Sequence, residues 1–115
     1  MTFPLEALSA AVAARAETWQ RLGMIWHVRP VAPNHGKAVV GSEFESAMLF
    51  GDLSIWITGE TELSTIRTTV DRMVNKHYDL TSLEDLDVPL DELVALLVDD
   101  RIPAAAVVAW HRGPS

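Results

Sequence analysis

The sequence predicts one α+β domain over residues 1–115, a two-layer sandwich in which helices cover a mainly antiparallel sheet of four to five strands. The length of 115 residues, with 49% hydrophobic content, suits a single core and is too short for two. The apolar pattern changes from a helical period to a period of two and back again. The resulting order, α-β-β-β-β-α-α-β, has no alternating βαβ units, which favours an α+β fold over a nucleotide-binding α/β fold.

The first helix is expected between Pro4 and Gly23. Pro4 suits the first helical turn, and Gly23 suits the position just past the helix end. Two further helices are expected in the second half, one from Thr61 to about residues 75–77 and one from Asp87 to just before Pro103, because apolar residues recur there at helical spacing. The apolar face of the first helix consists of Leu5, Leu8, Val12, Trp19 and Leu22.

Strands are expected where apolar and polar residues alternate. Residues 31–37 are rich in Pro, Asn and Gly and predict a loop, and Gly41 is expected to weaken or bulge its strand. Gly51-Asp52, between two apolar runs, predicts the turn of a tight β-hairpin. The expected strands are residues 24–29, 38–44, 47–50, 53–58 and 105–111.

Chemical motifs are sparse. The chain has no cysteine, which excludes thiol nucleophiles and zinc thiolate sites. None of its four histidines lies three or four residues from another, and its glycines do not form a phosphate-binding loop. Glu43 and Glu45 share a strand face, where a solvated role is expected over acid–base catalysis. The sequence therefore predicts a protein that is not an enzyme and binds no cofactor or metal.

The net charge of −7 opposes binding to phosphate backbones and argues against nucleic acid as a partner. Acidic residues concentrate in the last third of the chain, where a basic protein would be attracted. The longest apolar run, Ile102 to Trp110, is far shorter than the roughly 20 residues of a membrane span, and the N-terminus lacks the basic start of a signal peptide. A cytoplasmic protein, or a part of a particle made in the cytoplasm, is expected.

Tryptophan is the most prominent candidate for a contact residue, since four occur in the chain and tryptophan is enriched in binding hot spots. If Ile55 and Ile57 face the core, Trp56 faces the other side of its strand, where it is either a contact residue or covered by a helix. Ile25, His27 and Arg29 share the face opposite Trp26. The candidate protein-contact residues are His27, Arg29, Trp56, Asp91, Glu92, Asp99 and Asp100.

Three functions remain open on these observations. The expected run of a helix, a strand, a long loop, a hairpin and a second helix resembles that of small neck and tail-end proteins of bacteriophages, which implies a structural subunit of a homo-oligomer or larger assembly. Residues 88–93, followed by Pro103 and Trp110, resemble the C-terminal end of some bacterial toxin-immunity proteins, over less than a quarter of the chain and with a longer spacing from Pro103 to Trp110. That resemblance implies an inhibitor of a basic protein. The third hypothesis is a small enzyme or ligand-binding protein with a pocket near His27 and Trp56.

Overall fold

The computed structural model describes residues 2–110, which form an α+β domain built on a seven-stranded antiparallel sheet. The expected α+β class with a mainly antiparallel sheet is confirmed, and the described residues form three α-helices. The helices are α1 (Ala7–Ala14), α2 (Ala16–Leu22) and α3 (Asp87–Asp99), with a 3-10 helix η1 (Glu84–Leu86). The strands are β1 (Ile25–Val28), β2 (Ala32–Asn34), β3 (Lys37–Glu45), β4 (Leu49–Trp56), β5 (Glu60–Arg67), β6 (Arg72–Asp79) and β7 (Val107–Trp110).

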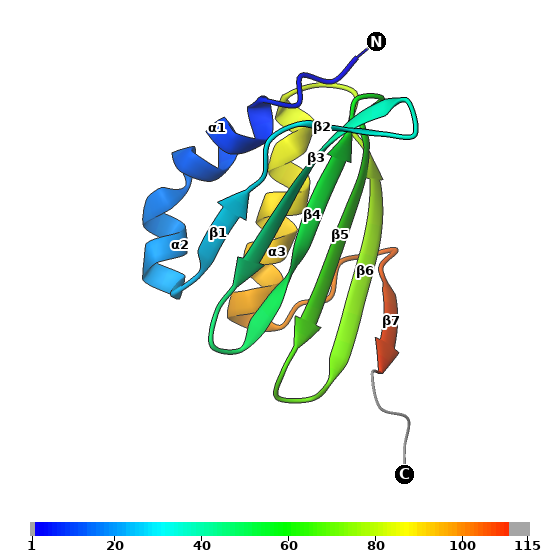
Figure 1. The fold of residues 1–115 in the computed structure, drawn as a ribbon. Coiled ribbons are helices and arrows are strands. Elements are labelled where there is room, and N and C mark those ends of the chain that lie inside the picture. The colour runs from blue at the N-terminus through cyan, green and yellow to red at the C-terminus, as the bar shows by residue number, and fades with distance from the viewer. Residues whose placement is uncertain (1, 111–115) are drawn as a thin grey trace.

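The sheet is a meander in the order β1-β3-β4-β5-β6-β7, with β2 paired to β3. Strands β3 to β6 follow one another through short turns, and every neighbouring pair is antiparallel. Figure 1 shows α3 behind the sheet, α1 on the same side as α3, and no helix of the described chain in front. The domain therefore has two layers, and one face of its sheet lacks a covering layer.

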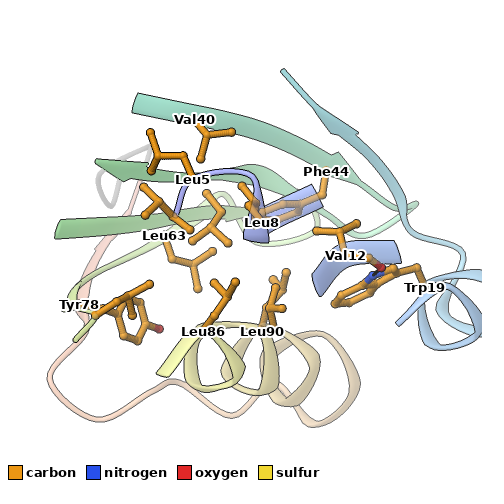
Figure 2. Close-up of a cluster of buried hydrophobic side chains, with 14 of the residues drawn as sticks. Leu5, Leu8, Val12, Trp19, Val40, Phe44, Leu63, Tyr78, Leu86 and Leu90 are labelled. Atoms are coloured by element: carbon orange, nitrogen blue, oxygen red, sulfur yellow. Dashed lines mark hydrogen bonds between the residues drawn. The ribbon is translucent and has the colours of Figure 1, made fainter. Parts of the chain in front are cut away.

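The hydrophobic core lies between the helices and the inner face of the sheet (Figure 2). Leu8 of α1 and Leu90 of α3 are fully buried and meet Leu63 of β5 in the same cluster. Alternation along the strands places every second side chain in this cluster, so the intervening side chains point to the opposite face. The elements that build the core thus also decide which residues form the uncovered face.

The helix expected from Thr61 to residues 75–77 is wrong, because this segment forms β5 and β6. Leu63, Ile66 and Met73 fit a helical spacing, but in β5 Leu63 is buried with Thr61 and Thr65, which gives a period of two. β-branched side chains favour the extended backbone here. Because this segment is extended, the sheet has seven strands instead of the expected four to five. The helical elements that follow β6 in the described chain are η1 and α3.

The expected hairpin turn at Gly51-Asp52 is also wrong, because both residues lie inside β4. The turn between β3 and β4 lies at residues 46–48, where the backbone N–H of Ser46 donates to the carbonyl oxygen of Leu49 over 2.7 Å. Glycine is required at position 51 because the strand β5 passes close to it, and not because the chain turns there. A Cβ atom at Gly51 would lie 2.0 Å from the carbonyl oxygen of Ser64 on β5, so its place in the strand depends on close backbone contact.

Several smaller expectations are refined. Gly23 ends α2 in the left-handed conformation (φ 69°), as its position predicts, but Arg15 divides the expected first helix into α1 and α2. Residues 32–34 form β2 instead of open loop, and β3 continues through Gly41 without a bulge. The last strand begins at Val107, and His111 at the end of the expected strand lies outside the described residues.

Candidate functional site: the uncovered sheet face

The outer face is the side of the sheet that no helix of residues 2–110 covers (Figure 1). In an antiparallel sheet, residues directly opposite one another on neighbouring strands point to the same side. The register therefore arranges the outward side chains in rows that run across the strands. Two adjacent rows on this face form the candidate site, one largely apolar and one polar and acidic.

The apolar row crosses five strands. It begins on β1 with Ile25, which is 70% exposed, and reaches β4 at Phe50, which is 42% exposed. Glu45 lies between these two side chains in the register. The row continues from Phe50 to Ile66 on β5 and Met73 on β6, both partly exposed. Apolar side chains aligned in this way offer a continuous contact area on a solvated face.

The acidic row is the next row on the same face and lies two residues away from the apolar row on each strand. His27, Glu43 and Asp52 are direct neighbours across β1, β3 and β4. Burial, together with the nearby charge of Glu43, raises the pKa of Asp52, because both disfavour its carboxylate form. Arg29 donates from Nε to Oε1 of Glu43 over 2.8 Å, and a second guanidinium nitrogen also contacts that carboxylate.

A shallow hollow of about 300 Å³ lies where these two rows meet at the β1–β3–β4 end of the sheet. Its walls combine aliphatic, aromatic, carboxylate and imidazole groups. Interface surfaces commonly place apolar anchors beside such polar groups. The lining residues are Ile25, His27, Glu43, Phe44, Glu45, Phe50 and Gly51.

A carboxylate–imidazole–carboxylate group occupies the outer face over β5 and β6. Nδ1 of His77 lies 2.7 Å from Glu62, and Nε2 lies 2.9 Å from Asp79. The hydrogen bond to Glu62, followed by the one to Asp79, raises the pKa of His77, because both carboxylates favour the protonated ring. In its protonated form, His77 offsets part of the negative charge of Glu62 and Asp79.

Three of the predicted contact residues lie on the outer face. His27 lines the hollow, and Arg29 lies beside it through its contact with Glu43. Ile55 is fully buried, so the condition for Trp56 to face outward is met, and Trp56 is partly exposed near the end of β4 away from Phe50. The structure thus brings His27 and Arg29 together but leaves Trp56 outside the lining of the hollow. Their role in binding stays a prediction.

The predicted acidic residues of the last third lie elsewhere, and most of them form ion pairs within the chain. Asp91 accepts a hydrogen bond from Arg15 over 2.7 Å. Glu92 contacts Nζ of Lys76 at 2.8 Å and accepts a hydrogen bond from the hydroxyl of Tyr78 at 2.7 Å. These pairs connect α3 to the junction between α1 and α2 and to β6, and they offset the local negative charge.

Asp99 and Asp100 are neighbours in the sequence, but of the two only Asp100 forms ion pairs with the described residues. Asp100 lies 3.0 Å from Nε of Arg67, and Nη1 of Arg72 donates to it over 3.0 Å. The hydrogen bond from Arg72, together with the nearby charges of Arg67 and Arg72, lowers the pKa of Asp100. Asp99 is exposed and forms no ion pair with the described residues.

The sequence reasoning missed Ile25, Glu45, Phe50 and Asp52 as members of one surface. Alternation already placed Glu43 with Glu45 and Ile25 with His27 on common strand faces. The register between β3 and β4 was the missing signal, because the expected turn at Gly51-Asp52 separated Phe50 and Asp52 from β3. The only sequence feature that pointed to it was the alternation from Leu49 through Trp56.

Trp19 and Trp26 contribute to the core side of β1. Their ring centroids are 5.2 Å apart, and Nε1 of Trp19 donates to the carbonyl oxygen of Val12 over 3.0 Å (Figure 2 labels Trp19 and Val12).

An apolar groove of about 660 Å³ lies beside Trp19 and Trp26, between α1, α2 and β1. Of the two residues expected to line one pocket, His27 lines the hollow and Trp56 does not.

Within residues 2–110, no three His, Asp or Glu side chains are grouped as metal ligands. None of the described helices has the length and apolar character needed to cross a membrane. Comparison of the chain with protein-family models, curated proteins and solved structures gave no match.

Proposed function

We propose that this chain is a non-enzymatic protein-binding domain and that the outer face of its sheet is the contact surface. The observation that carries the proposal is the exposed apolar row from Ile25 through Phe50 to Met73, on a sheet whose other face is packed against helices. Burial of such side chains by a partner contributes about 25 cal/mol for each Å² removed from water. Protein interfaces commonly have an apolar centre and a polar rim.

Site-specific photocrosslinking tests the contact surface. A benzophenone amino acid at Ile66, near the middle of the apolar row, is expected to give a discrete covalent adduct with another polypeptide in cells that produce the protein. The matched control is the same replacement at Val98, which is 55% exposed on α3. Adducts from neither position, or the same adducts from both, would contradict a contact surface on the outer face.

A second candidate function is that of an assembly subunit, such as a component of a bacteriophage neck or tail. It is favoured by β7, an edge strand whose Val107 and Trp110 are 66% and 59% exposed. The strand from Val107 to Trp110 carries no charge, so pairing with the same strand of a second copy brings no like charges of the two strands together. Exposed edge strands commonly pair in this way.

For the assembly candidate, light scattering over a range of protein concentration is expected to show a discrete oligomer. Val107→Lys is expected to convert it to a monomer, because a lysine on an edge strand opposes strand addition. Val98→Lys on α3 is the matched control and should leave the mass unchanged. If Trp56→Ser abolishes the oligomer instead, the self-contact lies on the outer face, and a monomer at every concentration eliminates self-assembly.

A further inference from the structure

We infer that the partner of the outer face is a basic protein surface, which places arginine or lysine beside an apolar side chain. This inference rests on the proposed function and specifies the partner of the same site. The contact centres on the acidic corner, which we define as Ile25, His27, Glu43, Glu45, Phe50 and Asp52 at the β1–β3–β4 end of the sheet. The acidic corner contains the exposed walls of the hollow together with Asp52.

The register fixes the geometry of the acidic corner. Glu45 stands between Ile25 and Phe50 in one row, and Glu43 stands between His27 and Asp52 in the next. Neighbouring strands lie about 4.8 Å apart, and residues two apart on a strand are separated by about 6.6 Å. A carboxylate is therefore within reach of the head group of any long basic side chain whose stem packs on Ile25 or Phe50.

The charges of the acidic corner are incompletely balanced within the chain. Arg29 contacts Glu43, but Glu45 and Asp52 form no ion pair with residues 2–110. This differs from Asp91, Glu92 and Asp100, whose ion pairs join parts of the fold. Carboxylates that crowd one another and lack a cation gain most when an incoming guanidinium or ammonium group is placed between them.

The contact between Arg29 and Glu43 shows that a guanidinium fits beside this row of the sheet. The same charge argues against two other occupants. A second copy of the chain would bring the carboxylates of two acidic corners together, and a nucleic acid would bring phosphates to them. The overall charge of −7 adds repulsion in both cases. Charge complementarity therefore selects a basic protein.

A titration monitored by amide chemical shifts tests this partner chemistry with defined probes. The probe is a short synthetic peptide of alternating arginine and leucine, and the comparison peptides alternate glutamate with leucine and arginine with serine. We expect the arginine–leucine peptide to shift the amides of residues 25–27, 43–45 and 50–52. The glutamate–leucine peptide should leave them unchanged, and the arginine–serine peptide should bind more weakly.

Variants separate the acidic corner from the general charge of the protein. Glu43→Gln with Glu45→Gln is expected to weaken binding of the arginine–leucine peptide about tenfold, since each tenfold change in affinity corresponds to 1.4 kcal/mol. The matched control, Glu84→Gln with Asp99→Asn, removes the same charge from exposed positions without ion pairs to the described chain and should leave the affinity within about twofold. Phe50→Ala should weaken the arginine–leucine peptide and leave the arginine–serine peptide unchanged.

Four results would overturn the inference. An equal loss in both charge variants would attribute binding to net charge alone, and shifts centred on α3 would place the site elsewhere. Self-association that moves the acidic-corner amides without peptide would assign the surface to a second copy. If crosslinking at Ile66 succeeds while the peptides bind without dependence on charge, the proposed function stands and only the basic partner is rejected.

Discussion

Gly51→Ala is expected to destabilise the protein by about 3 kcal/mol, at the upper end of the range for overpacked sites. The new Cβ would lie 2.0 Å from the carbonyl oxygen of Ser64 and 2.9 Å from Cα of Thr65. Both are backbone atoms of β5, so relief requires β4 and β5 to move apart along a pairing that spans Leu49 to Ile55. The midpoint of urea denaturation measures the loss.

Gly41→Ala is the matched control, since Gly41 also lies inside a central strand. A Cβ there would meet only Oγ of Ser54 at 3.9 Å and Cδ of Arg29 at 4.0 Å, which are ordinary contacts. Glycine in a strand interior costs about 0.5–1 kcal/mol relative to alanine, so Gly41→Ala should be neutral or stabilising. Equal destabilisation by both variants would show that the close contact of Gly51 with β5 does not control stability.

Asp100→Asn is expected to lower the free energy of unfolding by about 2 kcal/mol at neutral pH. The change leaves Arg67 and Arg72, whose side chains are 8% and 9% exposed, without their shared carboxylate. Loss of one partner from a fully buried ion pair costs about 3–5 kcal/mol, and the 47% exposure of the Asp100 side chain reduces this value. Asparagine also accepts the positive φ of 51° found at Asp100, so the backbone is not strained.

The pH dependence distinguishes the lost charge from other effects of the substitution. Because folding lowers the pKa of Asp100, its stabilising effect is fully present above the unfolded pKa of about 3.9 and is lost as the pH falls through the lower folded value. The stability difference between the two proteins should therefore shrink below about pH 4. Asp99→Asn, one residue away and without an ion pair in the described chain, should stay within about 0.5 kcal/mol of the parent at all pH values. A constant difference for Asp100→Asn across this range would contradict the ion-pair explanation.

The candidate site could be predicted only in part. Alternation along β1 and β3 placed Ile25 with His27 and Glu43 with Glu45, because the side-chain direction in a strand depends on its own sequence. The neighbours Phe50 and Asp52 could not be assigned, because their place depends on the register with β3. The acids of α3 were expected to attract a partner, but cations distant in sequence, such as Arg15 and Lys76, pair with Asp91 and Glu92.

The sequence by itself determined the α+β class, the position of α3 and the end of α2 at Gly23, because helical periodicity and the left-handed glycine that ends a helix are local properties. Only the tertiary structure decided that residues 61–77 pair as β5 and β6, since the spacing of Leu63, Ile66 and Met73 fits one face of a helix, whereas in the sheet Leu63 faces the core and the other two side chains face the opposite side. It also decided that Gly51 lies within a strand and that Ile25, Glu45 and Phe50 share a row. Strand pairing joins residues distant along the chain, and burial of one sheet face selects among periods that the local sequence allows equally.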